Sequence, residues 1–196
     1  MNKYLSKSPE LDAGGFQASR RSFLKMTACG SLLALSGTAA ANAPVKIPTL
    51  RKTLALEHIY TGDKLKLTYF EQGRYIEDAL QEISYLLRDY HTNDIHPIDP
   101  ALLDQLYDLK LMLGINEPFY FSSAYRSPHT NTSLRKKCQC AARHSLHMQG
   151  RAIDFQVDGL AARKIRNAAL SMSRGGVGYY KRSDYIHLDT GDFRHW

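Results

Sequence analysis

Two histidines and one aspartate are the residues of this chain whose types and spacing point most directly to chemistry. His147 and Asp154 both lie in the stretch from Ser145 to Asp154, and His187 follows 33 residues after that aspartate. Imidazole nitrogens and carboxylate oxygens are zinc ligands, and a catalytic zinc takes three protein ligands and leaves a fourth position to water. The pattern therefore indicates a hydrolytic metal site rather than a metal that only holds a fold together.

Strand geometry predicts how these three side chains meet. Residues two apart on a strand share a face of the sheet. A strand at 151–157 therefore fixes the face on which Asp154 lies, and a strand at 185–189 fixes the face of His187. Pairing of these two strands would bring the aspartate to the histidine. Gly150 would let the preceding loop turn so that the first histidine reaches the same point.

The remaining elements are read from hydropathy patterns and turn signals. An alternating pattern around Thr61-Gly62-Asp63 predicts a hairpin at 51–70, and apolar residues at helical spacing predict helices from Ile76 and from Asp99–Pro100 to Gly114. We also expect a strand at 119–122, a short helix beginning within 130–134, an exposed basic loop at 136–143, a helix at 160–172 and a strand at 177–180. Because helices and strands do not alternate regularly, we expect one α+β domain in which a small antiparallel sheet carries the zinc site.

The N-terminus has the features of a targeting segment. Arg20 and Arg21 form a twin-arginine motif, and a mild apolar run from Met26 to about Ala43 follows it. The run is too short and too weakly apolar for a stable span of about 20 residues, and small residues at 41–43 offer a cleavage site. We therefore expect residues 1–43 to be a signal peptide handled by the twin-arginine translocase, and residues 44–196 to be a periplasmic domain without a stable membrane span.

The charge of the chain limits its partners. The whole chain carries a net charge of +7, and residues 1–43 hold five basic and two acidic residues, which leaves +4 for residues 44–196. This mild excess suits a polyanionic envelope polymer. No basic-aromatic module accompanies it, so nucleic acid is not an expected partner.

Two cysteines remain after residue 43, at Cys138 and Cys140. A disulfide across so short a ring would be strained, and thiolates are also good zinc ligands. The interpretation we favour is two loop thiols without a catalytic role. A thiol-based metal sensor stays open as an alternative.

The motifs resemble those of a known family. The pattern Ser145-x-His147-x-x-Gly150-x-Ala152-x-Asp154 with a later His187 resembles the zinc D-alanyl-D-alanine peptidases of the M15 class, which share a fold with lysostaphin-type endopeptidases and the hedgehog signalling domain. The resemblance is closer to the DUF882/YcbK-type, MepK-like murein endopeptidases, which are exported by the twin-arginine route. It extends over the signal and the domain, through the motifs Ser123-Ala124-Tyr125-Arg126-Ser127, Gly175-Gly176-Val177-Gly178-Tyr179-Tyr180, His187-Leu188-Asp189-Thr190-Gly191 and Arg194-His195-Trp196.

The resemblance implies one Zn²⁺ per chain, held by His147, Asp154 and His187. It implies peptidoglycan as the substrate, with peptide cross-links containing meso-diaminopimelate. Arg126 matches the family arginine, which would stabilise an oxyanion or hold a substrate carboxylate. Asn131 occupies a position where related members often have a polar residue beside the site.

The general base is less defined by the sequence. Asp184 stands three residues before His187, as the glutamate does in the Glu-x-x-His motif of related dipeptidases, and it ranks first. His144 ranks second because it lies three residues before the first histidine ligand. Asp189 is the candidate for orienting a histidine ligand, and Tyr185, where lysostaphin-type relatives often have a histidine, is a candidate hydrogen-bond donor to an oxyanion.

These observations predict a periplasmic zinc peptidase that hydrolyses murein cross-links with a metal-activated water. A D,D-carboxypeptidase that trims terminal D-alanine is an alternative, because the motifs do not separate the two activities. A zinc-bearing module that binds the cell wall without catalysis is the non-enzymatic alternative.

Overall fold

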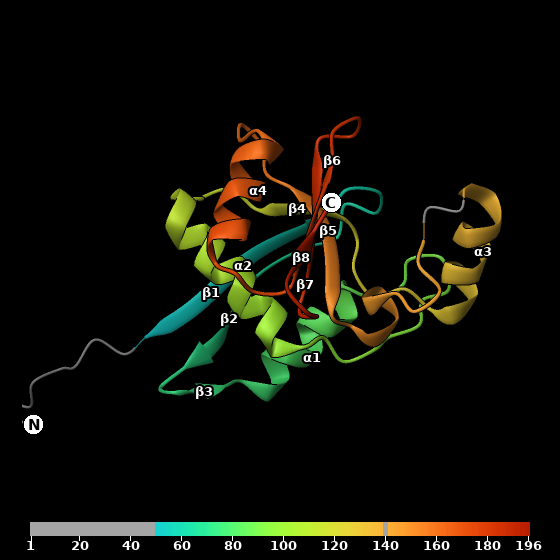
Figure 1. The fold of residues 1–196 in the computed structure, drawn as a ribbon. Helices are drawn as coiled ribbons and strands as arrows, with labels where there is room; N and C mark the ends of the chain where they lie inside the picture. The colour runs from blue at the N-terminus through green and yellow to red at the C-terminus, as the bar shows by residue number, and fades with distance from the viewer. Residues whose placement is uncertain (1–49, 139–140) are drawn as a thin grey trace, which may run out of the picture. The chain divides into compact units, whose positions relative to one another are not determined.

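The strands that carry the candidate ligands lie inside one β-sheet. The computed structural model describes residues 50–138 and 141–196, so the expected signal segment 1–43 and Cys140 lie outside the described residues. The sheet order is β3-β2-β1-β4-β5-β7-β6-β8 (Figure 1). The strands are β1 (Arg51–His58), β2 (Lys64–Glu71), β3 (Arg74–Tyr75), β4 (Phe119–Ser123), β5 (Ala152–Gln156), β6 (Gly176–Tyr180), β7 (Tyr185–Asp189) and β8 (Arg194–His195).

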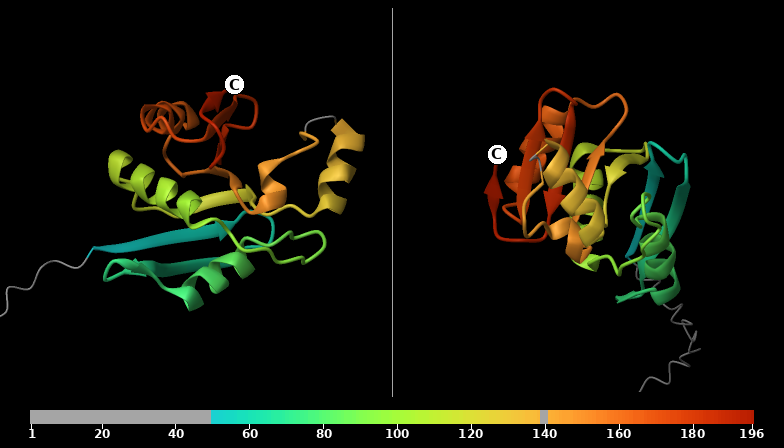
Figure 2. Two further views of the ribbon diagram at one scale, coloured as in Figure 1. Left: turned by 60° about the horizontal axis from the view of Figure 1, so that its bottom comes forward. Right: turned by 90° about the vertical axis from the view of Figure 1, so that its right-hand side faces the viewer.

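Helices pack against this sheet and complete the α+β domain. They are α1 (Glu77–Leu86), α2 (Pro100–Leu113), α3 (Pro128–Cys138), α4 (Ala162–Ser171) and the short 3₁₀ helix η1 (Leu146–Gln149). Helix α1 contacts β2, α2 contacts β1, and α4 contacts β6 and β7. Helix α3 stands apart from these three (Figure 2). Within 50–138 and 141–196, no helix is both long and apolar enough to cross a membrane.

The sheet is larger than the small antiparallel sheet expected from the sequence, and it is mixed. Strands β1 and β4 pair in parallel, as do β6 and β8, whereas the pairs β4–β5, β5–β7 and β7–β6 are antiparallel. The N-terminal hairpin joins the same sheet because Leu54, Leu56, Phe119 and Phe121 present one continuous apolar face. The antiparallel expectation therefore applies to the strands around the site and not to the whole sheet.

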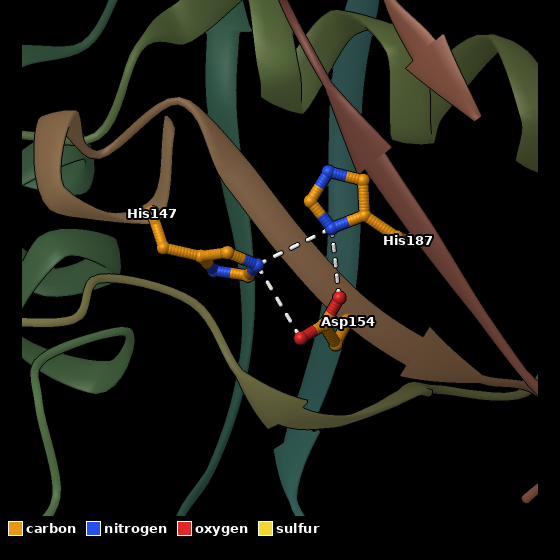
Figure 3. A group of neighbouring side chains, drawn as sticks. All are labelled: His147, Asp154 and His187. Atoms are coloured by element: carbon orange, nitrogen blue, oxygen red, sulfur yellow. Dashed lines mark hydrogen bonds and ion pairs between the residues drawn. The ribbon is translucent and has the colours of Figure 1, made fainter. Parts of the chain in front are cut away.

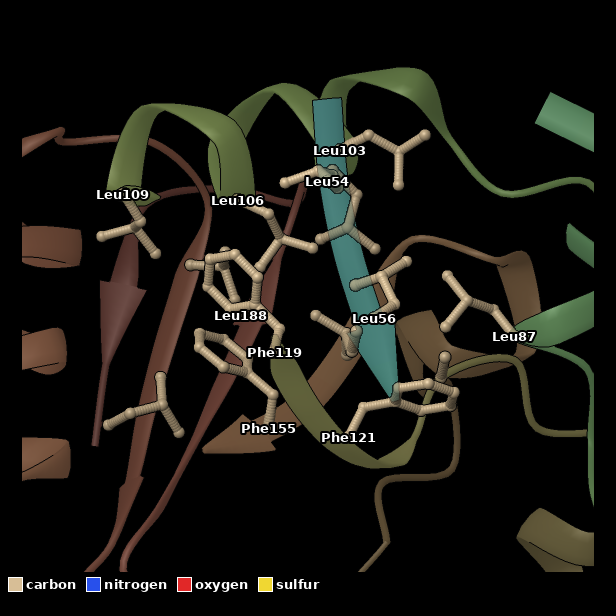
Figure 4. Close-up of a cluster of buried hydrophobic side chains, with 14 of the residues drawn as sticks. Leu54, Leu56, Leu87, Leu103, Leu106, Leu109, Phe119, Phe121, Phe155 and Leu188 are labelled. Atoms are coloured by element: carbon tan, nitrogen blue, oxygen red, sulfur yellow. The ribbon is translucent and has the colours of Figure 1, made fainter. Parts of the chain in front are cut away.

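Alternation along the central strands separates the core from the site. Ile153 and Phe155 on β5, with Ile186 and Leu188 on β7, are buried in the apolar core beneath the helices (Figure 4). Residues between them in the sequence point to the opposite face, as period-two geometry requires. The same register that packs the core therefore fixes what lies on the other face.

Local signals explain most element boundaries. The carboxylate of Asp99 accepts a hydrogen bond from the Ala101 amide at 2.9 Å and caps α2, and Gly114 ends that helix in a left-handed conformation, as predicted. The expected basic loop at 136–143 was partly wrong, since α3 continues to Cys138. The start of α3 is set by Ser127, whose Oγ accepts a hydrogen bond from the Thr130 amide at 3.2 Å.

The helix expected at 160–172 is observed in a shorter form. Leu160 pairs with Val157 in an isolated β-bridge, so the chain cannot enter the helix until Ala162. Ile165 and Ala169, four residues apart on one face of this helix, are buried. The hairpin, the helices from Ile76 and Asp99, and the strands at 119–122, 151–157, 177–180 and 185–189 are confirmed within one or two residues.

Candidate active site

His147 reaches the site from η1, directly before β5. Ser145 accepts a hydrogen bond from the His147 amide, and Gly150 ends the turn at φ +65°. A Cβ at that glycine would collide with the carbonyl oxygen of Pro97, so the position requires glycine. The prediction that Gly150 turns the chain toward the site is confirmed.

Asp154 and His187 are opposite each other on paired strands. The register of β5 and β7 aligns these two residues directly, as predicted from the strand pattern. Asp154 Oδ1 lies 2.9 Å from Nδ1 of His187, and Asp154 Oδ2 lies 3.3 Å from Nε2 of His147. The two ring nitrogens are 3.2 Å apart. Figure 3 shows these three side chains pointing toward one another from η1, β5 and β7.

The outer nitrogen of each histidine faces only an acceptor. Nδ1 of His147 lies 2.6 Å from the carbonyl oxygen of Ala124, and Nε2 of His187 lies 2.8 Å from Asp189 Oδ2. A carbonyl or carboxylate oxygen can only accept, so each outer nitrogen carries the hydrogen and donates. In the neutral rings, both inner nitrogens therefore present lone pairs toward the carboxylate of Asp154.

These three groups fit a zinc ion. A tetrahedral zinc with ligand bonds of about 2.0–2.1 Å places neighbouring ligand atoms roughly 3.3 Å apart. The two ring nitrogens, at 3.2 Å, and Asp154 Oδ2 with Nε2 of His147, at 3.3 Å, are close to that separation. Lone pairs and a carboxylate turned toward one another repel unless a cation or a proton lies among them. Within the described part of the chain, His147, Asp154 and His187 are the group of His, Cys, Asp and Glu side chains arranged to hold a metal.

Burial and mutual contacts shift the pKa values of these groups. Burial lowers the pKa of His147, although Asp154 opposes that change. Burial alone would raise the pKa of Asp154, but the charge and hydrogen bonds of the two histidines outweigh it and hold that pKa well below its usual range. For His187, burial is outweighed by hydrogen bonds to Asp154 and Asp189, which raise its pKa. A proton on His187 therefore competes directly with a metal ion.

Asp189 takes the orienting position considered for it in the sequence. It is fully buried, and its carboxylate accepts from His187 Nε2 at 2.8 Å and from the two terminal nitrogens of the Arg194 guanidinium at 3.0 and 2.6 Å. Such a carboxylate behind a histidine ligand fixes the tautomer and the ring orientation. The geometry thus places Asp189 behind the three inner groups and not among them.

Arg126 lies beside the candidate ligands, as the sequence predicted. Its Nη2 donates to Ser123 Oγ at 3.0 Å and lies 3.4 Å from Asp154 Oδ2. The backbone amide of Arg126 donates to the carbonyl of His147 at 3.1 Å. The loop after β4 and η1 therefore hold each other in place and bring the guanidinium to the carboxylate.

The two candidate bases occupy different places. His144 is exposed and lines the cavity above the three ligands. Asp184 lies on the exposed turn between β6 and β7 with φ +48°, and it is not among the residues that line this cavity. Asn131 is buried and donates to the carbonyl of Ala142 at 3.0 Å, so it supports the loop after α3. The roles considered for Cys138 and Cys140 depend on side chains outside the described structure.

A cleft of about 450 Å³ opens over the three candidate ligands. A second hollow of about 420 Å³ adjoins it, shares Tyr60, Ser122 and Tyr185 with it, and continues along β5 to Gln156. Burial and the nearby Asp154 raise the pKa of Tyr185 to about 12, so its hydroxyl remains a donor at neutral pH. The sequence reasoning identified this tyrosine as a site residue.

Other residues of the cleft were missed. Asp89 is buried and accepts from the amides of Ser127 and His91 at 2.8 and 2.9 Å, which ties the loop after α1 to the loop that carries Arg126. Trp196 lies with its ring centre 5.2 Å from that of His187. The polar and aromatic run Asp89-Tyr90-His91 after an amphipathic helix was the available signal for the first of these contacts.

Comparisons with known proteins agree with this geometry. The family model described as Peptidoglycan L,D-endopeptidase MepK matches residues 47–196. The chain is 42% identical over 172 residues to Peptidoglycan L,D-endopeptidase MepK of Escherichia coli (strain K12), covering 84% of this chain and 94% of that protein. It is 36% identical over 146 residues to the Probable peptidoglycan L,D-endopeptidase MepK of Haemophilus influenzae, covering 74% and 78%. The chain therefore belongs to the MepK family of M15 murein endopeptidases.

Proposed function

We propose that the protein is a zinc-dependent peptidoglycan endopeptidase that hydrolyses peptide cross-links. The observation that carries this proposal is the convergence of His147, Asp154 and His187 at the base of an open cleft. Relatives from the same family are named L,D-endopeptidases, so we assign to this chain a bond between residues of L and D configuration. A cross-link that contains meso-diaminopimelate is the substrate we propose.

The residues around the cleft have distinct roles in this proposal. When bound, zinc supplies Lewis-acid polarisation of the scissile carbonyl and acidifies a water molecule. Arg126 presents its guanidinium beside Asp154 and stabilises the negative charge that develops on the carbonyl oxygen. Tyr185 lines the same cleft and offers a hydroxyl donor to that oxygen.

A general base must move a proton from water to the leaving amine. His144 lines the cleft, and Asp184 lies on the neighbouring turn outside its lining, so we now place His144 first. Separate substitutions, His144→Ala and Asp184→Asn, test this order. A large loss of kcat confined to the first variant supports the assignment, and a loss confined to the second reverses it.

The length of the cleft supports an endopeptidase over a carboxypeptidase. The cleft over the candidate ligands adjoins the hollow that runs along β5 toward Gln156, which leaves room for peptide beyond the scissile bond in that direction. A carboxypeptidase needs room for only one terminal residue beyond the scissile bond.

The twin-arginine motif supports export through the translocase to the periplasm, where peptidoglycan is the substrate.

The decisive experiment incubates purified residues 44–196 with intact murein sacculi and defined cross-linked muropeptides, with and without a chelator. Chelator-sensitive conversion of dimers to monomers, read by mass, supports the endopeptidase and identifies the bond. Loss of D-alanine alone identifies a D,D-carboxypeptidase. Zinc-loaded protein that binds sacculi without any product identifies a cell-wall-binding module. Arg126→Ala should lower kcat by about 10²–10³, as expected for the loss of one oxyanion donor.

A further inference from the structure

The segment that follows β7 returns to the sheet beside the site. Strand β8 pairs in parallel with β6, and backbone hydrogen bonds connect Trp196 with Val177 and Tyr179 at 3.3 and 3.1 Å. Strand β6 in turn pairs with β7, where Gly178 is directly opposite His187. Arg194 and Trp196 are therefore anchored with only β6 between their strand and the strand of this histidine.

Two glycines of β6 make space for these side chains. A Cβ at Gly176 would lie 2.5 Å from both Arg194 Nη1 and Asp189 Oδ2, and a Cβ at Gly178 would lie 2.6 Å from the indole of Trp196. Val177 between them is fully buried in the core. Glycine inside a strand marks a place where another group approaches closely. On the face of β6 toward the site, the absence of side chains at these two glycines leaves the space that Arg194 and Trp196 occupy.

The arginine completes the surroundings of a buried carboxylate. Asp189 is fully buried and accepts at Oδ1 from the amides of Gly176 and Gly191, both at 2.9 Å. Arg194 binds both carboxylate oxygens in a forked geometry, and His187 uses Oδ2. Planar, bidentate recognition of this kind gives direction as well as charge neutralisation. Without the guanidinium, the buried carboxylate would lose its cationic partner, and only the two amides and His187 would hold it.

We propose that Arg194 is a positioning residue for the metal site. Through Asp189 it fixes the ring of His187 so that Nδ1 faces Asp154, while Trp196, at a ring distance of 5.2 Å, packs against the same ring. The inference rests on the proposed function only in taking His187 as a metal ligand. It differs from a simple surface ion pair because one partner is fully buried and also bonds the ligand.

The test measures the dissociation constant for zinc by competition with a chromophoric chelator. Loss of the group that bonds a histidine ligand directly costs about 10- to 100-fold in metal affinity, so Arg194→Gln, which acts through that group, should weaken binding about 10-fold, at the lower end of this range. Arg194→Lys should fall between this variant and the wild type, because an ammonium keeps the charge but not the fork. Arg174→Gln is the matched control, since Arg174 forms a partly exposed ion pair with Asp108 and should leave zinc binding unchanged.

A double-mutant cycle separates positioning from general damage. If Arg194 acts through Asp189, zinc binding by the Asp189→Asn variant should not weaken further when Arg194→Gln is added. Unchanged binding in Arg194→Gln, or losses that add independently in the double variant, would overturn the inference. The visible absorption of the cobalt(II)-loaded variants reports whether the ligand geometry has changed.

The proposed function and this inference fail in different ways. If zinc binding follows the expected order but sacculi are not cleaved, positioning holds and the endopeptidase proposal fails. If the wild type binds no zinc, heteronuclear NMR of the metal-free protein at mildly alkaline pH tests whether Arg194 fixes the ring of His187. Positioning is supported if the His187 ring is a single tautomer with its hydrogen on Nε2 in the wild type and a mixture of both tautomers in Arg194→Gln. The same tautomer signal in both proteins refutes it.

Discussion

The carboxylate of Asp154 is the best single position at which to test the metal site. It faces the inner nitrogens of His147 and His187 at 3.3 and 2.9 Å. Asp154→Asn keeps the size of the side chain but removes its negative charge and replaces one oxygen with an NH2 group, which can donate to a histidine nitrogen but cannot bind zinc. We therefore expect a folded variant in which zinc binding is severely weakened.

The size of this effect follows from binding energies. Four-ligand structural zinc sites bind with about 10–16 kcal/mol, so one ligand contributes roughly 3 kcal/mol, and its loss raises the zinc Kd about 100-fold. At a zinc concentration of about 100 times the wild-type Kd, binding stabilises the wild type by about 2.7 kcal/mol and the variant by about 0.4 kcal/mol. A domain of this size gains about 2–4 °C in Tm per kcal/mol, so zinc should raise Tm by roughly 5–11 °C in the wild type and by about 1 °C in the variant.

Thermal unfolding with added zinc and with a chelator measures this difference within each protein. Asp158→Asn is the matched control, because it makes the same charge change in the exposed turn that follows β5. A zinc-induced Tm increase in Asp154→Asn equal to that of the wild type would remove Asp154 from the ligand set. A loss of the increase in Asp158→Asn would assign the effect to net charge and not to coordination.

Three further outcomes are expected. Phe155→Ala should lower the free energy of unfolding by about 3–5 kcal/mol in chemical denaturation, because it opens a cavity in the buried core. Acid should destabilise the protein through Asp104, since hydrogen bonds from Lys52, Tyr75 and Tyr69 outweigh burial and hold its pKa below the ordinary 3.8. This stability is present above that value and is lost as the pH falls through the lowered pKa. As the pH is lowered, zinc affinity measured by chelator competition should fall about tenfold per pH unit for each ligand proton that zinc must displace.

Each of these outcomes has its own control. Leu111→Ala removes a side chain that is 61% exposed on α2, and a loss as large as that of Phe155→Ala would mean that burial does not set the cost. Asp104→Asn should flatten the acid dependence of unfolding, and an unchanged pH profile would assign that dependence to other carboxyl groups. Zinc affinity that does not change with pH would mean that no histidine protonates in competition with the metal.

The convergence of the candidate ligands was predictable because most of its geometry is local to two strands. Period-two alternation put Asp154 and His187 on definite faces, and the direct pairing of β5 with β7 followed from matching those faces. The turn at Gly150 was predictable for a similar reason, since a glycine beside a buried strand signals an unusual backbone angle. Helix boundaries at Asp99 and Gly114 were set by caps that act within four residues.

Features that depend on distant pairing were not predictable in the same way. The parallel pairing of β1 with β4 requires a crossover through α1 and α2, and no local pattern in either strand specifies it. Strand β8 has two residues, too few for any periodicity to indicate a strand. The contact of Arg194 with Asp189 depends on that pairing, so the sequence pointed to Asp189 as an orienting residue without its arginine.

The core and the site of this protein are two consequences of one strand register. Phe155 and Ile186 pair on the core face of β5 and β7, and Asp154 pairs with His187 one residue away on the opposite face. A slip of one residue would turn the aspartate and the histidine into the apolar core, where an unpaired carboxylate costs several kcal/mol or more. Apolar packing thus holds the two candidate ligands opposite each other in the metal-free protein. Core substitutions that loosen this pairing, Phe155→Ala among them, should therefore weaken zinc binding as well as stability, although none of these side chains touches the ligand atoms.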